Sequence, residues 1–291
     1  MSSNLLMKGD PVPFAKSMSK LVNNKEFSDI KFIVGEERRH IFAHRCILVS
    51  RCEVFRAMFA EQVMRENSGK VPLVLTDTEP DIFMIVLEFI YTNCATLSGK
   101  TVVDVLASSI EYGLEELRKV CNAYLIQNLS ELTACETIQA AVTYGQDLLR
   151  NTVLAFIEEH TVTVFKHPRF EELSEESLAV ILQSNRLKMD EMDILATVIN
   201  WALVNATVQR IPTLQAISKV IKHVRLPLLS EDELQKVERE NETNQVVPIE
   251  MVSAAWRFHA LHRSDGINPQ TRLRRGTTSR DSHHGLTPWE D

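Results

Sequence analysis

The residue types that could bind a metal are present in this sequence, but their spacing forms no recognised metal-binding motif. His40 and His44 lie near Cys46 and Cys52, and both residue types are common zinc ligands. Histidines four residues apart share a face only on a helix, whereas the alternation of this stretch predicts a strand. No Cys-x-x-Cys pair accompanies them, so we interpret all four as structural or exposed residues.

The candidates for catalysis are equally isolated. Ser50 and Ser109 lack the Gly-x-Ser-x-Gly turn that presents a hydrolase nucleophile. The nine glycines are scattered, so no glycine-rich loop is available to hold a nucleotide. The adjacent glutamates at 36–37 and 175–176 would point apart on a strand or a helix, which is unsuitable for an acid–base pair. We therefore expect no enzyme activity, no cofactor and no bound metal.

Composition favours a soluble interaction protein. The 291 residues are 44% hydrophobic and 24% charged, as in globular proteins that bury a core. The net charge of −7 argues against direct nucleic-acid binding, which needs a clustered basic face. The five scattered cysteines favour a reducing compartment and thiols used as small core residues. No signal peptide or membrane-spanning run is evident, so we expect a cytoplasmic or nuclear protein with no membrane contact.

The chain is organised around the stretch from His40 to Phe59, which begins as a strand and continues as a helix with one apolar face. Residues 30–34 and 40–43 alternate on either side of a charged turn, which predicts a β-hairpin. Residues 71–75 predict a third strand. Helices are expected at 11–25, around the Phe55 and Phe89 clusters, and at 102–112 and 114–125. Residues 10–126 are thus predicted to form an α+β unit, a small sheet wrapped by helices.

After Ser130 the pattern becomes all-helical. Thr133 to Glu136 and Ser230 to Glu233 each have the spacing of a capping box. Helices are expected near residues 134–146, 148–160, 174–184, 190–205, 212–222 and 249–261. Residues 130–262 therefore predict an antiparallel helical domain. The Ser-, Thr-, Arg- and Gly-rich composition of residues 263–291 predicts a disordered tail.

Several spaced motifs in the first half resemble the BTB/POZ domain. They are Phe27-Ser-Asp29-Ile-x-Phe32-x-Val34, His40-x-Phe42-x-Ala-His44-Arg45-x-x-Leu48-x-Ser50, Phe55-Arg-Ala-Met58-Phe59 and Phe89-Ile-Tyr91-Thr92. The second half resembles the BACK domain of kelch-type proteins. The residues that carry this second resemblance are Phe170-Glu-Glu-Leu173, Asn185-Arg-Leu187, Trp201 and Val224-Arg-Leu-Pro-Leu-Leu229. The chain ends where the first kelch blade of such a protein would begin.

The resemblance implies a homodimer whose first helix packs on the partner subunit. Phe14, Met18 and Leu21 are the residues that would make this contact. Asp29 and Arg45 match a charged pair near the dimer interface of family members, and such a pair is tolerated in a partly buried site only when hydrogen-bonded. The alternative is that Asp29 caps a strand and Arg45 is solvated.

The resemblance also implies recruitment of cullin-3, which would make the protein an adaptor of a ubiquitin ligase. The family's contact is an apolar-x-Glu motif that follows the Phe55–Phe59 helix, and Met64 with Glu66 fits it beside Phe59. The loop before Val71 is a residue or two longer than in typical members, and the alternative is an ordinary polar helix end. The second candidate function is a BTB scaffold that recruits transcriptional co-regulators or other partners without a cullin.

The tail contains Arg272, Arg274, Arg275 and Arg280 close to the hydroxyl residues 277–279. This pattern is consistent with a nuclear localisation signal or with kinase target sites at Thr277, Thr278 or Ser279. The simpler interpretation is a solvated tail with a net charge near zero. The target protein of the adaptor is not indicated by any motif.

Overall fold

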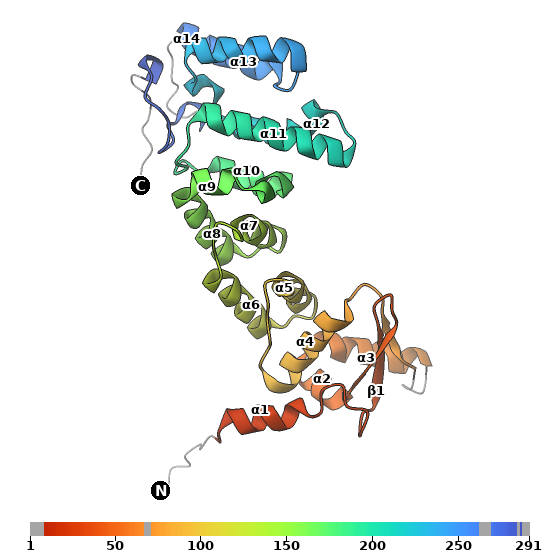
Figure 1. The fold of residues 1–291 in the computed structure, drawn as a ribbon. Coiled ribbons are helices and arrows are strands. Elements are labelled where there is room, and N and C mark those ends of the chain that lie inside the picture. The colour runs from red at the N-terminus through yellow and green to blue at the C-terminus, as the bar shows by residue number, and fades with distance from the viewer. Residues whose placement is uncertain (1–8, 67–70, 262–268, 284–285, 287–291) are drawn as a thin grey trace. The chain divides into compact units, whose positions relative to one another are not determined.

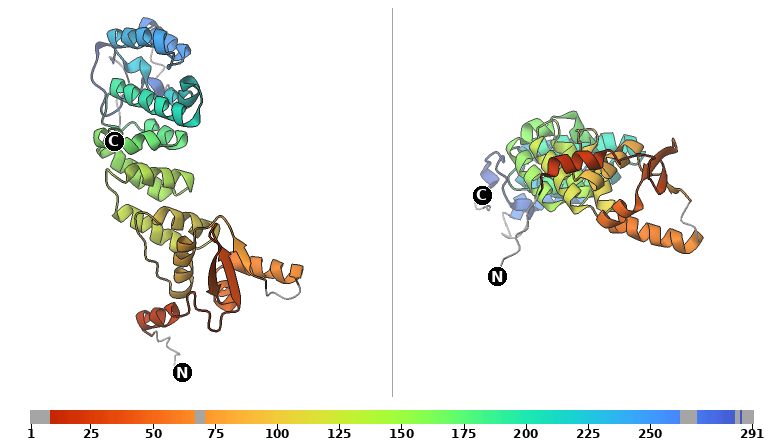
Figure 2. Two further views of the ribbon diagram at one scale, coloured as in Figure 1. Left: turned by 45° about the vertical axis from the view of Figure 1, so that its right-hand side comes forward. Right: turned by 90° about the horizontal axis from the view of Figure 1, so that it is seen from below.

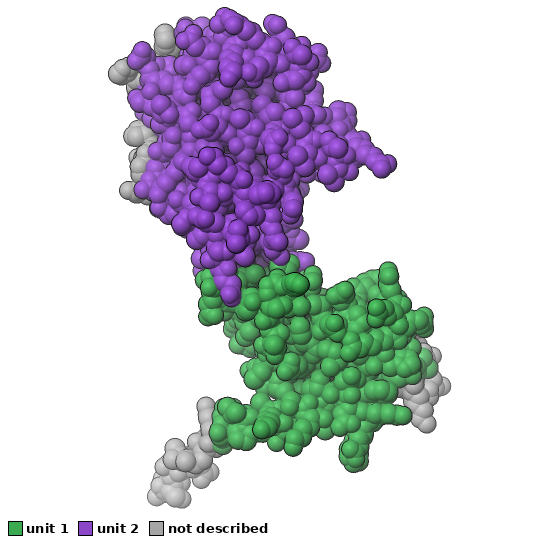
Figure 3. Space-filling view, in the orientation of Figure 1, with its two compact units in different colours: residues 1–127 green, residues 128–291 purple. Residues whose placement is uncertain are grey.

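The chain forms two compact units, Met1–Gln127 and Asn128–Asp291, in a computed structural model that describes residues 9–66, 71–261, 269–283 and 286 (Figures 1 and 3). Unit 1 contains a small sheet and the surrounding helices. Its elements are α1 (Pro11–Ser19), β1 (Ile30–Val34), β2 (Arg39–Ala43), α2 (Arg45–Arg51), α3 (Glu53–Glu66), β3 (Leu73–Leu75), α4 (Pro80–Thr92), α5 (Val102–Glu111) and α6 (Glu115–Gln127). The first helix ends at Ser19, earlier than the predicted residue 25.

Within the described residues of unit 1, the sheet has three strands in the order β2-β1-β3. β1 is antiparallel to β2 and parallel to β3, so that Phe32 lies opposite both Ile41 and Leu73. Alternate residues of β1 are buried, because one face of the sheet packs on helices. Gly35 ends β1 with a φ of +72°, and a Cβ there would lie 2.9 Å from the Pro80 ring. Both the turn and this close approach therefore require glycine.

An aromatic cluster forms the core of unit 1. The ring of Phe32 lies 5.8 Å from Phe55 and 5.1 Å from Phe83, in edge-to-face arrangements. Phe55 also stacks on Tyr112, with ring centroids 5.0 Å apart. All four side chains are almost completely buried. The cluster joins the sheet to α3, α4 and the end of α5, and the predicted α+β architecture is confirmed.

The helical stretch predicted from Ile47 to Phe59 is divided in two. Cys52 adopts an extended conformation with φ −142° and ψ 114°, which ends α2 before α3 begins. Its thiol donates a hydrogen bond to the carbonyl oxygen of Tyr112 at 3.2 Å. The break therefore lies directly against the end of α5, a tertiary contact that local periodicity does not reveal.

Every regular element in the described part of unit 2 is helical, which confirms the predicted all-α second half (Figure 2). The helices are α7 (Ala134–Thr143), α8 (Asp147–Glu159), α9 (Thr161–Phe165), α10 (Glu175–Gln183), α11 (Glu191–Gln209), α12 (Thr213–Ile217), α13 (Glu231–Asn244) and α14 (Ile249–Leu261). Short 3-10 turns occur at Pro168–Glu172, Ile221–His223, Leu226–Leu228, Pro269–Thr271 and Asp281–His283. Trp201 of α11 is buried and donates through its indole N–H to the carbonyl oxygen of Leu173 at 2.9 Å.

The two predicted capping boxes have different outcomes. At the start of α13, Ser230 accepts from the N–H of Glu233, and the Glu233 carboxylate accepts from the N–H of Ser230, so this box is confirmed. The box at Thr133 is wrong. The Thr133 hydroxyl instead accepts from the N–H of Ser130 and donates to the carbonyl oxygen of Asn128, which lie before the helix.

The prediction of disorder for residues 263–291 is corrected for the described tail segment, residues 269–283. The Arg274 side chain is fully buried and forms an ion pair with the equally buried Glu191, 2.5 Å from its Oε1 atom. The Arg274 guanidinium also donates to the carbonyl oxygens of Leu182 and His223, each at 2.7 Å. Residues 262–268, 284–285 and 287–291 lie outside the described part of the chain.

Backbone contacts extend this anchoring. The N–H of Arg275 donates to the carbonyl oxygen of Asn185, and that of Gly276 donates to Leu187, both at 2.9 Å. A Cβ on Gly276 would lie only 2.0 Å from the backbone nitrogen of Met189. Charged contacts to distant parts of the sequence thus order a segment whose local composition is typical of disorder.

Candidate interaction surface

Among the residues considered for metal binding, His44 has a structural role. The buried His44 ring places Nδ1 3.0 Å from the Tyr91 hydroxyl oxygen, and this hydroxyl also accepts from the His44 N–H at 2.9 Å. His40 lies on β2 and is exposed. Among the described residues, no group of three or more His, Cys, Asp or Glu side chains could hold a metal ion.

The buried cysteines are poorly suited to nucleophilic chemistry. Burial raises the pKa of Cys121 to about 12 and that of Cys135 to about 11. Burial likewise raises the pKa of Cys52. A thiol with so high a pKa is almost entirely protonated at neutral pH, so these side chains act as small apolar core residues.

Helix α1 carries the exposed apolar surface that the sequence assigned to dimerisation. Asp10 begins the helix by accepting from the N–H of Val12 at 2.9 Å. Phe14 is 64% exposed and Val12 is 70% exposed, and α1 contains no buried residue. Met18 is half-buried, whereas Leu21 lies half-buried in the turn after the helix. The inner side of α1 packs on α4, so its outer side is left uncovered in the single chain.

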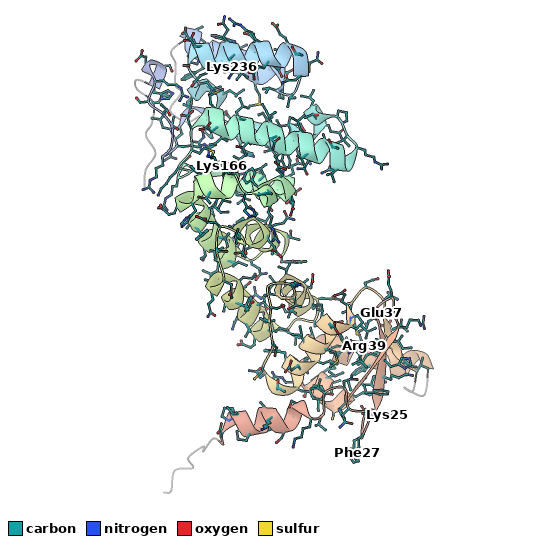
Figure 4. The ribbon with its side chains drawn as sticks, in the orientation of Figure 1. Lys25, Phe27, Glu37, Arg39, Lys166 and Lys236 are labelled. Atoms are coloured by element: carbon teal, nitrogen blue, oxygen red, sulfur yellow. The ribbon has the colours of Figure 1, made fainter. Side chains whose placement is uncertain are left out.

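Phe27 is a further exposed aromatic residue that the sequence did not assign to an interface. Its side chain is 83% exposed, and Figure 4 shows it pointing away from the body of unit 1. Its backbone has a φ of +63°, which is unfavourable for a bulky residue. The side chain is thus an isolated exposed aromatic group on a strained backbone position. One feature of the sequence could have indicated this exposure: Phe27 precedes Ser28 and lies outside the alternating pattern of β1.

Asp29 and Arg45 are brought together by a cap on helix α2. The Asp29 carboxylate accepts a hydrogen bond from the backbone N–H of Arg45 at 2.7 Å. His44 occupies the N-cap position of α2, but its side chain makes no capping hydrogen bond. Asp29 is exposed in the single chain. Its hydrogen bond to Arg45 should therefore contribute about 0.5–2 kcal/mol to folding stability, as a helix cap does, and not the larger energy of a buried ion pair. Side-chain pairing of these residues in a dimer stays a prediction.

The guanidinium of Arg45 covers Phe59. Its central carbon lies 4.5 Å from the centre of the Phe59 ring, a distance typical of a cation–π contact. Phe59 is only 5% exposed and stacks on Phe55 at 6.1 Å. Phe59 is therefore part of the core of unit 1 and offers almost no surface to a partner.

The other two residues predicted to bind a cullin, Met64 and Glu66, lie in the last turns of α3. Their side chains are outside the described residues. The helical backbone alone places both residues at the C-terminal end of α3.

A shallow hollow lies where α1 meets α4. It has a volume of about 270 Å³ and is lined by Ser19, Val22, Met84, Ile85 and Glu88. This hollow adjoins the end of the helix that carries Phe14. Apolar side chains with a single carboxylate form a surface suited to a protein partner rather than to a phosphorylated or metal-bound ligand.

Comparison with protein families agrees with this arrangement of a sheet-containing unit followed by helices. Residues 18–129 match the family model of the BTB/POZ domain. Residues 134–239 match that of the BACK domain, described as BTB and C-terminal Kelch. The chain belongs to the family of BTB/POZ proteins that carry a BACK domain.

Individual relatives support the assignment over almost the whole chain. The chain is 37% identical over 284 residues to BTB/POZ domain-containing protein 19 of Bos taurus and to that of Homo sapiens, and the alignments cover 97% of this chain and of each relative. It is also 32% identical to BTB/POZ domain-containing protein 9 of Drosophila melanogaster, over 78% of this chain but 30% of that protein. The predicted family is confirmed.

Members of this family are generally non-catalytic protein-interaction adaptors, and their BTB domains mediate dimerisation and partner binding. The exposed apolar side of α1 is consistent with this general role. In the described ranges, no helix has the length and apolar composition needed to cross a membrane.

Proposed function

We propose that the protein is a non-catalytic homodimeric adaptor that joins cullin-3 to a target protein. The observation that carries the proposal is the apolar outer side of α1, where Phe14 is 64% exposed. Burial of a large apolar side chain contributes about 1.5–3 kcal/mol, so covering this side favours dimerisation. The same proposal places the protein in the cytoplasm, the nucleus or both.

The dimer is tested by light scattering at micromolar concentration. The wild-type chain is expected at twice its monomer mass of 33.1 kDa. Phe14→Asp should shift the protein to monomer, because a carboxylate would have to be buried between the subunits.

Leu148→Asp is the matched control for this substitution. Leu148 is 75% exposed and lies in the first turn of α8, where a carboxylate is well tolerated. This variant should remain dimeric. A wild-type chain at the monomer mass, or a Phe14→Asp variant that stays dimeric, would contradict the proposed interface.

Recruitment of cullin-3 is tested by calorimetric titration of its N-terminal domain. An apolar anchor at the centre of an interface carries about 2 kcal/mol or more, so Met64→Ala should weaken binding roughly thirtyfold. Glu66→Ala should have a smaller effect that decreases with added salt, as expected for a charge at the rim. Glu250→Ala in unit 2, where the residue is exposed, should leave the affinity unchanged.

The alternative is a dimeric scaffold for transcriptional co-regulators or other partners, with no cullin. The buried position of Phe59 favours this alternative, because one of the residues assigned to the cullin contact has almost no exposed surface. Absence of cullin binding at high micromolar concentration, with an intact dimer, would support this second function.

A further inference from the structure

The tail segment, residues 269–283, links the start of two helices in unit 2 through a single arginine. Arg280 donates to the Asp190 carboxylate at 2.8 Å and to the Glu233 carboxylate at 2.7 Å. Asp190 is the N-cap of α11 and accepts from the N–H of Met192, while Glu233 belongs to the capping box of α13. The arginine therefore holds the tail segment against both caps.

Thr278 touches the same carboxylate. Its backbone N–H donates to Asp190 Oδ2 at 2.7 Å. Although burial raises the pKa of Asp190, the hydrogen bonds from Arg280, Thr278 and Met192 outweigh it and lower the pKa to about 2. Asp190 is thus ionised at neutral pH, and the position beside it is unfavourable for a second anion.

Thr278 is also accessible and preceded by basic residues. Its side chain is exposed, and Arg275 lies three residues before it. From this position we propose that Thr278 is a phosphorylation site and that its phosphate releases the tail segment from unit 2. The proposal does not depend on dimerisation or on cullin binding.

The modifying enzyme would be a protein kinase that recognises an arginine before its acceptor and uses ATP. The Thr278 oxygen attacks the γ-phosphorus, and a new oxygen–phosphorus bond forms. The bond from this phosphorus to the β–γ bridging oxygen breaks, and its electron pair leaves with ADP. The hydroxyl proton passes to a base of the kinase.

The phosphate would change the balance of charge at the two caps. It adds a charge of about −1.5 to −2 next to the Asp190 carboxylate, which already accepts from the backbone N–H of Thr278. Asp190, Glu233 and the phosphate would then share Arg280, so repulsion between the anionic groups opposes the closed position.

Arg274 is fully buried while the segment is closed, and the segment must therefore open before a kinase can bind it in an extended form.

The test treats the full chain with a purified calmodulin-dependent protein kinase and magnesium ATP, and maps phosphate by mass spectrometry. Phosphate is expected on Thr278. Gly276→Ala should raise the initial rate about tenfold or more, because its Cβ cannot fit beside Met189 and the segment opens. Arg280→Gln provides a second way of opening the segment, without a steric clash.

Hydrogen exchange then measures the effect of the phosphate. The amides of Gly276 and Thr278, which are hydrogen-bonded in the closed segment, should exchange at least about tenfold faster after modification. Thr278→Ala, treated in the same way, should show unchanged exchange of the Gly276 amide. Lack of phosphate on Thr278 in the wild type and both opened variants would overturn the proposal. Modification of Thr277 or Ser279 in its place, or a phosphorylated Thr278 with unchanged exchange, would also overturn it.

Discussion

At the scale of single residues, the most consequential contact is the buried ion pair of Arg274 and Glu191. Both side chains are fully buried, and Glu191 also accepts from the backbone N–H of Arg225 at 3.0 Å. Glu191 thus fixes two separate segments that follow it in the chain. The negative charge of Glu191 is balanced by Arg274, a residue of the tail segment. This segment follows α14 in the chain.

Arg274→Met should destabilise unit 2 by about 3–5 kcal/mol, because the substitution leaves Glu191 buried without its counter-ion. Lys236→Met, which removes an exposed pair with Glu240, should change the unfolding free energy by less than about 0.5 kcal/mol. Urea denaturation measures both variants. Adding Glu191→Gln to Arg274→Met should recover part of the lost stability, because the buried carboxylate is then removed. If Arg274→Met and Lys236→Met changed the unfolding free energy equally, the Arg274–Glu191 pair would not be buried.

Residue patterns in the sequence predicted local features well and distant contacts poorly. The capping box at Ser230 is correct because both of its partners lie within one turn. The box at Thr133 fails because Ser130 and Asn128 compete for the same hydroxyl. Asp29 is identified as an important residue, but its exposure and its cap on Arg45 depend on the path of the chain. The outward position of Phe27 is likewise set by a backbone conformation that composition does not reveal.

At the scale of elements, periodicity identified most helices because most of them bury one face. Residues 249–261 have the predicted bounds, and β1 alternates as expected. The break at Cys52 escaped prediction because its partner, the Tyr112 carbonyl, is distant in the sequence. The tail segment escaped for the same reason, since its anchors on α10, α11 and α13 are charged or backbone groups rather than an apolar stripe.

The contact between the tail segment and the caps of α11 and α13 should weaken in acid. The pKa of Asp190 falls from 3.8 to about 2 on folding, so its ionisation stabilises the folded state by about 2 kcal/mol above pH 4. This contribution is lost as the pH falls from about 4 through 2, because the unfolded carboxyl binds its proton first. The difference in unfolding free energy between the wild type and Asp190→Asn should therefore shrink over this range. A constant difference would contradict the linkage.

At the scale of the whole molecule, each unit has its own core. The aromatic cluster around Phe32 belongs to unit 1, while Trp201 and the Arg274–Glu191 pair belong to unit 2. The boundary between the units, after Gln127, lies close to the boundary between the two family matches. The BTB/POZ match ends at residue 129 and the BACK match begins at residue 134. The BACK match ends at 239, yet α14 and the tail segment still belong to unit 2.

Removal of residues 269–291 should therefore affect unit 2 alone. Loss of the Arg274 ion pair is expected to lower the melting temperature of this unit by about 10 °C, given about 3–5 kcal/mol and a domain of this size. The transition of unit 1 should keep its temperature. Differential scanning calorimetry distinguishes the two, and an unchanged unit 2 transition would show that the tail segment contributes nothing to its stability.

The close approach at Gly276 has a consequence for inherited variation. Every amino acid other than glycine carries a Cβ, and here that atom would overlap the backbone of Met189 and Lys188. All missense changes of this codon should therefore have a similar effect regardless of the charge or polarity of the new residue. A saturation scan of cellular protein abundance would show a uniform loss at this codon, whereas the exposed Ser279 codon would tolerate most replacements.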